Sequence, residues 1–562
     1  MQTLDYDWEE YKELELKKLL KKNIVLSLLL LLFLTSDKST HFIGSKLNIS
    51  PQEINDLPKA VDHPFKEHLD ISVAIWDIDS AFQNAEKDEL LQQLQKKFNI
   101  TLHPVQINWA NFQDKIKVWA ASDKLPDIFA TNLADTDIPL YQAWAKQGIV
   151  RALPTDMSKF PHLKAYLQSP EVQLLQIEGK FYAFPRYSVP AIDQTMTAKA
   201  ILVRKDWMDK LELRDPQSFE EFKVMLKSFV DRDPNGNGKK DEIGLEGNGA
   251  NSNYLNFVFS PSLPSSMNYY YVLENGKWIP NYVSAKYPKV LTQWRELYHL
   301  NLLDPDFAIF KDKEGVDAFA QGKAGALAYS VNIAHIKLAS DLWEQYNPGS
   351  LFADHVKMLP IWPDANGTRY HYAQGTYWSE SYFNANISDA KMERIMYLYD
   401  YLMSEEGSFL VKFGRENIDY KLENGQWVSL LKQGEKLNEK YPSLGALSVL
   451  AAWAEDIDAI DMPINRKKFG EANFQLFLDS RKWMQANTQA IPLNLKIQSI
   501  LQLQPIIAGV SFQDASDDAV KIVLGKDNIT EAWKAKLIEY EKLGIANQIE
   551  AVNKEALKQG IE

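Results

Sequence analysis

Strand-like and helix-like segments alternate along the chain after residue 70, and this alternation constrains the fold more than any other feature. The run Ile71–Trp76 is typical of a buried strand, a helical pattern follows near 86–98, and a second strand is expected at 100–107. Further strands are expected at 127–130, 181–184, 201–204, 324–329 and 356–360, and further helices near 111–121, 390–403 and 530–543. Such alternation predicts an α/β fold with a mainly parallel sheet.

The length and composition indicate a folded protein of more than one lobe. The chain has 562 residues, whereas a single hydrophobic core usually supports roughly 250–300. Apolar residues make up 45% and charged residues 24%, as in globular proteins. The net charge of −13 argues against nucleic-acid binding, which needs a basic face. Cysteine is absent, which excludes thiol nucleophiles, disulfides and cysteine-ligated metal centres.

The N-terminal region carries a pattern typical of an export signal. Lysines at 17, 18, 21 and 22 precede the apolar run 24–34, which is too short to span a membrane as a helix. A buried core helix is the alternative, but the run is apolar on all sides and bounded by polar residues. We therefore expect a signal-like or anchor-like segment at 1–36 and a polar tether with three prolines at 37–66.

The end of the apolar run is similar to the lipobox of bacterial surface lipoproteins, with one essential difference. Leu34-Thr35-Ser36 is followed by Asp37, where that motif has the cysteine whose thiol carries the lipid. Lipidation by that route is therefore impossible for this sequence. We expect export to the cell surface or the extracytoplasmic space, and both release and retention by an uncleaved signal stay open.

The sharpest chemical pattern is a loop rich in oxygen-bearing side chains. Its first half matches the spacing of an EF-hand calcium loop, but Gly244 stands where an EF-hand has its closing glutamate. Calcium prefers about six to eight oxygen ligands on a flexible loop, so we predict one structural Ca²⁺ site. A solvated turn is the alternative, since Asn and Gly favour turns. The candidate ligands are Asp233, Asn235, Asn237, Asp241 and Glu242.

Several aromatic residues are expected at the carboxyl ends of strands, where open α/β sheets bind ligands. Trp76 ends the first strand, Tyr329 ends the strand at 324–329, and Tyr377 and Trp378 precede Phe383. Aromatic rings pack against the apolar faces of sugar rings, but they are equally typical of protein cores. Their positions favour a ligand site lined by aromatic side chains.

The sequence lacks the common motifs of hydrolases, metalloproteases and nucleotide-binding proteins. Glu455, Asp456 and Asp458 could supply the carboxylate pair of a glycosidase. Such a pair must lie roughly 5–9 Å apart across a sugar, which sequence proximity does not establish. A solvated acidic loop is the alternative reading of this cluster.

Six segments, in this order, resemble the large extracellular sugar-binding proteins of bacterial carbohydrate ABC importers, in the maltose-binding-like superfamily. The resemblance is to the branch with a calcium loop, which includes alginate-binding proteins and Paenibacillus-type surface lipoproteins, and it runs from about residue 70 to 545. The segments are LPDI at 125–128, EGKFYAFPR at 178–186, LVRKDW at 202–207, the calcium loop through 243, QGKAGA at 321–326 and FGRENIDY at 413–420.

This resemblance implies an α/β fold with two lobes joined by crossing strands and a sugar in the cleft between them. The crossings would lie at 181–190 and 374–383. The implied division is a first lobe of 67–187 plus about 375–412, a second lobe of 188–374 plus about 413–545 with the calcium loop 231–243, and a helical tail at 546–562.

The resemblance also implies site residues. The backbone of Lys239 would join the five calcium ligands named above. Cleft aromatics of the family match Tyr329 and Trp453. We add four further candidates for ligand binding, at strand ends and at a crossing: Trp76, Asn132, Tyr187 and Trp378.

We therefore expect a monomeric, non-enzymatic receptor that captures an oligosaccharide by hinge closure and delivers it to the transmembrane subunits of an ABC permease. No nucleic-acid partner is expected. Two alternatives stay open: a carbohydrate sensor or adhesion protein with this fold, and a secreted polysaccharide-degrading enzyme that uses Glu455 or Asp458.

Overall fold

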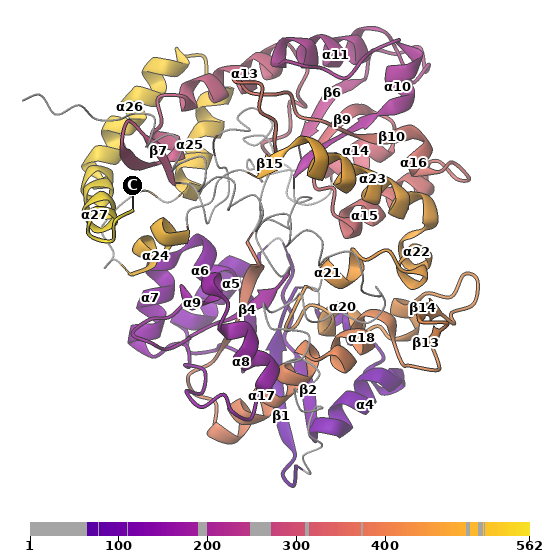
Figure 1. Ribbon diagram of the computed structural model, residues 1–562, viewed down its shortest axis with the longest axis vertical. Helices are drawn as coiled ribbons and strands as arrows, with labels where there is room; N and C mark the ends of the chain where they lie inside the picture. Colours follow the sequence, from indigo (N-terminus) through magenta and orange to yellow (C-terminus); the bar gives the residue numbers. More distant parts are fainter. Residues whose placement is uncertain are drawn as a thin grey trace, which may run out of the picture.

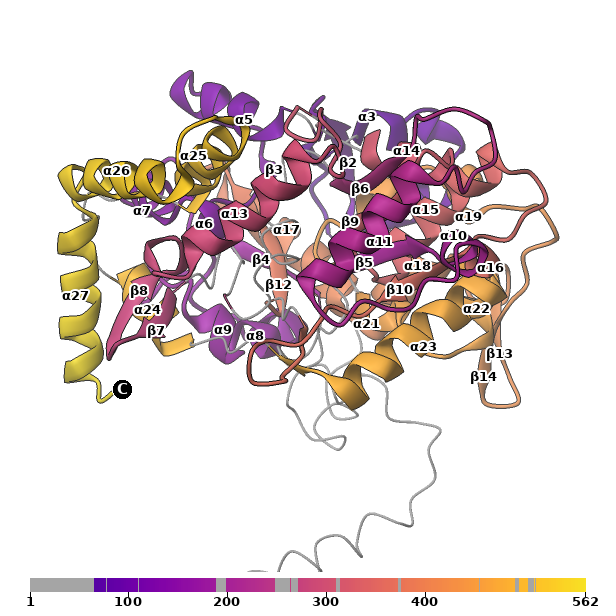
Figure 2. The same ribbon diagram turned by 90° about the horizontal axis from the view of Figure 1, so that it is seen from above.

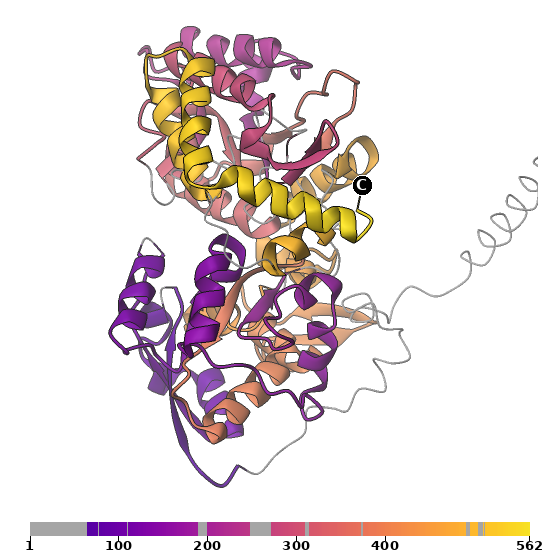
Figure 3. The ribbon, with the colours of Figure 1, turned by 90° about the vertical axis from the view of Figure 1, so that its left-hand side faces the viewer.

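The computed structural model describes residues 65–561 apart from 77, 110, 189–198, 248–262, 264–270, 310–313, 372–374, 454, 491–494, 504–509 and 511. The predicted signal segment and nearly all of the predicted tether therefore lie outside the described residues. Within the described part, no helix combines the length and apolar character needed to cross a membrane. The chain folds into two lobes, drawn one above the other in Figures 1 and 3.

The first lobe is built on a mixed sheet of five described strands in the order β2-β1-β3-β12-β4. β1 pairs in parallel with β2 and β3, whereas β12 runs antiparallel to both β3 and β4. The prediction of a mainly parallel sheet is therefore wrong, because β12 re-enters the sheet after the chain has passed through the second lobe. The strands are β1 Leu69–Ala74, β2 Ile100–Pro104, β3 Ile128–Thr131, β4 Phe184–Tyr187 and β12 Tyr377–Phe383.

Amphipathic helices pack their apolar faces on this sheet. In α4, for example, Leu90, Leu94 and Phe98 are buried at helical spacing, and the Asp88 carboxylate caps the helix by accepting from the Leu91 N–H at 2.9 Å. The same core contains Leu447 and Ala451, so the first lobe includes a stretch beyond about 412 that we expected in the second. The main helices are α4 Glu89–Phe98, α5 Phe112–Ala121, α7 Ile138–Gln147, α8 Pro161–Leu167, α17 Asp389–Met403 and α18 Glu405–Phe413.

The second lobe contains a mixed sheet of four described strands in the order β10-β5-β9-β6. Successive residues of β5, and of β9 from Ala326 onward, pack alternately in two hydrophobic cores, because helices cover both faces of the sheet. The strands are β5 Ala200–Arg204, β6 Ile243–Gly247, β9 Ala324–Tyr329 and β10 Val356–Leu359. The covering helices include α11 Phe219–Asp231, α13 Tyr287–His299, α14 Glu314–Ala320, α15 Ile333–Tyr346 and α23 Glu471–Asn487.

The chain passes between the lobes after β4, before β12 and again after Trp453. Of the predicted crossings at 181–190 and 374–383, residues 189–190 and 374 lie outside the described residues. β4 and β12 themselves belong to the first sheet. The third passage runs through α21 (Glu455–Asp458) and α22 (Pro463–Phe469) to α23 of the second lobe.

The segment Leu-Glu-Asn-Gly-x-Trp occurs twice, at 273–278 and 422–427, and forms a β-hairpin in both places. The central Asn and Gly residues have positive φ in both, 51° and 71° at Asn275 and Gly276, and 50° and 76° at Asn424 and Gly425. The hairpins lie at opposite sides of the molecule (Figure 2). They are β7 Tyr271–Glu274 with β8 Lys277–Pro280, and β13 Tyr420–Glu423 with β14 Gln426–Ser429.

The C-terminal helices pack on the second lobe and its first hairpin. α25 (Phe512–Leu524) and α26 (Ile529–Lys542) contact α13. α27 (Ile545–Lys558) packs on β8 and on α24 (Leu495–Leu503) in a small separate core. The Asn553 amide accepts from the Trp278 N–H and donates to its carbonyl, both at 2.8 Å. The predicted helical tail is thus a helix anchored to the hairpin.

Candidate ligand site and metal loop

Four tryptophans from distant parts of the sequence lie against one another in the first lobe. Trp76 follows β1, Trp109 follows β2, Trp378 is in β12 and Trp453 precedes α21. The Trp76 ring stacks on Trp378 and on Trp453 with centroids 5.6 Å apart in both pairs, and the Trp109 ring lies 5.2 Å from Trp76. We call these four residues the tryptophan cluster.

The four rings differ in their access to solvent. Trp76 is only 8% exposed and forms the centre of the cluster, whereas Trp109 is 42% exposed and Trp378 and Trp453 are half-buried. Trp76 therefore supports the cluster, and the other three have ring surface open to solvent. Because the exposed rings gather where β1 and β2 end, the cluster lies at the edge of the sheet where α/β proteins bind ligands.

A buried arginine stabilises the cluster from within the lobe. The guanidinium of Arg186 lies 4.9 Å from the Trp76 ring centroid, which is a cation–π contact. It donates to the Ser379 hydroxyl at 2.7 Å and to the Glu380 carbonyl at 3.1 Å. Burial lowers the pKa of Arg186 to about 10, so the group is still charged at neutral pH.

The cluster residues are also tied to the strands by hydrogen bonds. The Trp453 N–H donates to the Tyr187 carbonyl at 2.7 Å, and its indole N–H donates to the Trp378 carbonyl at 2.9 Å. The Tyr187 ring is buried and packs edge-on against Tyr166. Tyr187, predicted to contact ligand, thus adjoins the cluster through its backbone while its ring belongs to the core.

Two other predicted ligand residues lie outside the cluster. Asn132 is buried at the end of β3 and accepts from the Gln113 amide at 2.8 Å. Tyr329 is 1% exposed at the end of β9 in the second lobe, with its ring 5.0 Å from His335. The structure thus brings Trp76, Trp378 and Trp453 together and leaves Tyr329 apart. The sequence analysis missed Trp109, although it follows β2 just as Trp76 follows β1.

A buried carboxyl group lies where the first two passages leave the first sheet. Glu171, on α9 (Pro170–Gln173), accepts from the Thr376 N–H at 2.7 Å and from its hydroxyl at 2.5 Å. The Thr376 carbonyl in turn accepts from the Ser188 N–H at 2.9 Å. Burial raises the pKa of Glu171 to about 7, against the opposing effect of the Thr376 hydrogen bonds.

We expect Glu171→Gln to remove a pH dependence of stability between about pH 5 and pH 7. The folded-state pKa of about 7 exceeds the ordinary value of 4.5, so wild type loses stability as pH rises from 4.5 through 7. The neutral amide does not titrate. Thermal melts at pH 5, 6, 7 and 8 measure this, with the exposed Glu86→Gln as the control that keeps the wild-type profile. An unchanged profile in Glu171→Gln would contradict the assignment.

The predicted calcium loop curls around the carboxylate of Asp233. Its oxygens accept from the N–H groups of Gly236, Asn237 and Gly238 at 2.9, 3.0 and 3.0 Å. Asn237 accepts from the Lys239 N–H at 2.7 Å and donates to Asp241 at 2.9 Å. These contacts draw oxygen-bearing side chains to one side of a short loop.

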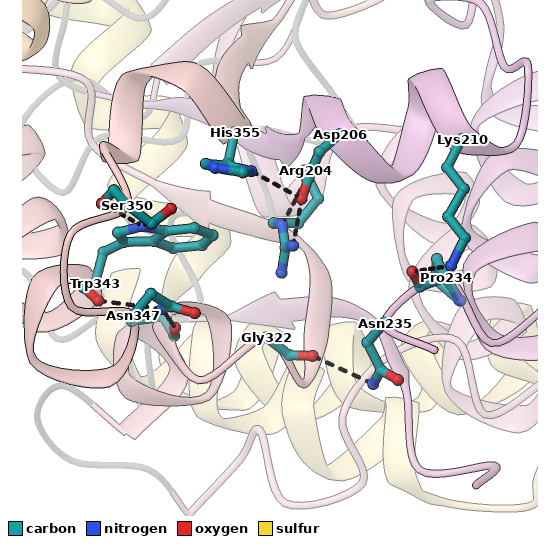
Figure 4. A network of polar contacts seen from close by, with 11 residues as sticks. Arg204, Asp206, Lys210, Pro234, Asn235, Gly322, Trp343, Asn347, Ser350 and His355 are labelled. Carbon is teal, nitrogen blue, oxygen red and sulfur yellow. Dashed lines mark hydrogen bonds and ion pairs between the residues drawn. The ribbon is translucent and has the colours of Figure 1, made fainter. Parts of the chain in front are cut away.

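Neighbouring elements hold the loop in place (Figure 4). The Lys210 ammonium on α10 (Lys205–Lys210) donates to the Pro234 carbonyl at 2.8 Å, and the Asn235 amide donates to the Gly322 carbonyl at 3.5 Å. Gly322 lies in the turn before β9. The start of the loop is therefore attached to α10 and to the turn before β9.

The loop fits a cation best at Glu242. It is 7% exposed, and both of its carboxylate oxygens are buried without a hydrogen-bond partner. Burial raises its pKa, and the nearby Asp233 and Asp241 carboxylates add to that effect. A divalent cation among the three carboxylates would offset most of their negative charge. In the described residues no group of three His, Asp or Glu side chains lies close enough to hold a metal ion. The predicted calcium ligands also include the side-chain amides of Asn235 and Asn237 and the backbone carbonyl of Lys239.

In the acidic cluster after Trp453, Asp458 is the one residue whose side chain is described, and its surroundings do not suit the general acid of a glycosidase. Burial opposes the ionisation of Asp458, but the ammonium groups of Lys412 and Lys468 outweigh it and hold the pKa of Asp458 below its ordinary value. A general acid needs the opposite shift. The side chains of Glu455 and Asp456 lie outside the described residues.

Residues 82–407, more than half of the chain, match the family model of bacterial extracellular solute-binding proteins. The chain belongs to this family. The predicted two-lobed α/β fold is thereby confirmed, as is the resemblance to solute-binding proteins.

Known solute-binding proteins match most of the chain. The polygalacturonan/rhamnogalacturonan-binding protein YtcQ of Bacillus subtilis is 22% identical over 482 residues, covering 85% of this chain and 89% of its own. The structure of FusA from S. pneumoniae with kestose has a TM-score of 0.64 at 17% identity, covering 88% of this chain and 99% of its own. The alginate-binding protein AlgQ2, solved without calcium ion, has a TM-score of 0.64 at 16% identity and the same coverage. The two structures show a shared fold.

Proposed function

We propose that this solute-binding protein captures an oligosaccharide on the tryptophan cluster and delivers it to the permease of an ABC transporter. The observation that carries the proposal is the exposed ring surface of Trp109, Trp378 and Trp453 at the sheet edge. Flat indoles match the apolar faces of sugar rings, and ligand sites combine such rings with a few polar groups. The sugar-binding names of YtcQ, AlgQ2 and FusA support this assignment.

The proposed mechanism is closure of the two lobes around the sugar. The cluster belongs entirely to the first lobe, so a sugar resting on it also contacts the second lobe only when the lobes approach. Contacts made in the closed state alone shift the open–closed equilibrium toward it. We place the receptor outside the cytoplasmic membrane, acting as a monomer, in keeping with the extracellular family it belongs to.

We also propose one structural Ca²⁺ ion in the loop, held by side-chain oxygens and the Lys239 carbonyl. The ion would offset the repulsion among the carboxylates of Asp233, Asp241 and Glu242 near the start of β6. Two structures that share the fold support this proposal. AlgQ2 was solved without calcium ion, and FusA was solved as an EF-hand mutant. The side-chain ligands would be Asp233, Asn235, Asn237, Asp241 and Glu242.

A thermal-shift screen tests the proposed function. The protein from about His41 onward is melted in calcium against neutral and acidic oligosaccharides, since a ligand at 100 times its Kd adds about 2.7 kcal/mol to native stability. We expect one sugar class to raise the Tm without being consumed. Consumption of the sugar would indicate an enzyme instead. No shift with any sugar of a broad panel would contradict the assignment.

A further inference from the structure

A lysine ammonium contacts the backbone of the tryptophan cluster. Lys412, near the end of α18, is buried at 9% exposure, and its Nζ donates to the Trp453 carbonyl at 2.7 Å. Trp453 thus makes three polar contacts to the first lobe: its N–H to β4, its indole N–H to β12 and its carbonyl to α18. Because it lies in a connecting segment, these contacts rather than secondary structure fix its position.

The Lys412 ammonium is held in turn by Asp458. The Asp458 carboxylate lies 3.4 Å from the Lys412 Nζ and 2.8 Å from the Lys468 Nζ, and it is 6% exposed. Lys468 belongs to α22, and its ammonium also lies 5.3 Å from the Phe413 ring of α18. One buried carboxylate therefore joins the end of α18 to the segment that leads into the second lobe.

We propose that Lys412 is a positioning residue that keeps Trp453 in the tryptophan cluster, and that Asp458 fixes Lys412 for this purpose. The third passage between the lobes starts at Trp453. A movement of the lobes therefore displaces this residue unless other contacts hold it. The charged hydrogen bond from Lys412 anchors the Trp453 backbone on the first-lobe side of that passage. The indole then stays stacked on Trp76 whether the lobes are open or closed. This inference rests on the proposed function only for its effect on sugar affinity.

The test uses Lys412→Met, which keeps the apolar length of the side chain and removes the donor. Asp458 keeps Lys468 as its partner in this variant, so no charge is left unpaired. We expect the affinity for the stabilising sugar to fall roughly tenfold. Without the charged hydrogen bond to its carbonyl, Trp453 shifts, and its indole no longer meets the sugar in the same position. We also expect a weaker exciton couplet of the stacked indoles in circular dichroism, a signal that needs no sugar. Lys412→Arg keeps a donor and should restore both.

Lys440→Met is the matched control. It breaks the ion pair between another first-lobe lysine and a buried carboxylate, that of Asp419. Asp419 keeps hydrogen bonds from the Arg415 N–H and the Tyr441 hydroxyl. We expect it to keep the couplet and the affinity, even if its Tm falls. A folded Lys412→Met protein with the wild-type couplet would overturn the inference, as would equal losses in both variants. If wild type binds no sugar, the proposed function fails. The exciton couplet still tests whether Lys412 positions Trp453, because that signal needs no sugar.

Discussion

Trp453→Ala is expected to weaken the binding of the stabilising sugar at least about 30-fold. Truncating a central aromatic contact costs about 2 kcal/mol or more, and 1.4 kcal/mol is a factor of ten. The substitution removes one ring of the proposed sugar site. It also removes a stacking partner of Trp76, whose ring centroid lies 5.6 Å from that of Trp453. Titration calorimetry of the folded variant measures the loss.

Trp427→Ala is the matched control for this experiment. Trp427 is also half-buried, but it belongs to the hairpin β13–β14 and packs on Phe409 of α18, away from the cluster. Its loss should leave the affinity within about twofold, since it touches no proposed ligand surface. If both variants lost affinity equally, or Trp453→Ala bound normally while folded, the cluster would not be the sugar site.

Calcium is expected to raise the Tm of wild type by several degrees, and Asp233→Ala with Asp241→Ala to remove that increase. A ligand at 1,000 times its Kd adds about 4.1 kcal/mol to native stability. In chelator the double variant should melt close to wild type, because the repulsion among the carboxylates is relieved there. Melts in calcium and in chelator, with metal analysis of each sample, measure the effect.

Asp209→Ala is the control for calcium. Asp209 is an exposed carboxylate on α10, paired with Lys205, and its loss should keep the calcium shift. A wild-type protein shown by metal analysis to be stripped, and whose Tm then does not respond to added calcium, would show that the loop is only a turn.

Local structure followed closely from the sequence. The strand predicted at 324–329 has the same bounds in the structure, and the helix expected at 390–403 begins one residue earlier. Both hairpins turn at Asn-Gly, the pair typical of a type I′ turn, which requires positive φ at both positions. Residue periodicity determines these elements locally, but it carries no information on strand direction. The antiparallel β12 could therefore not be predicted.

The candidate site was only partly predictable, for a related reason. Trp76 and Trp378 were found by the rule that ligands bind past the ends of strands. The same rule applies to Trp109, which was overlooked, and it misplaced Tyr329, whose ring is buried in the second lobe. The contact between Lys412 and the Trp453 carbonyl leaves no trace in the sequence, since every residue has a backbone carbonyl.

The position of β12 between β3 and β4 determines the order in which the two sheets can be completed. All four described strands of the second sheet are synthesised by Leu359, before β12 begins at Tyr377. The first sheet, although it starts the chain, stays in two pieces until β12 has been made. Until then β3 and β4 expose strand edges, which are sites of wrong pairing with other chains. A chain that leaves the cell N-terminus first therefore needs those edges shielded until its C-terminal half arrives.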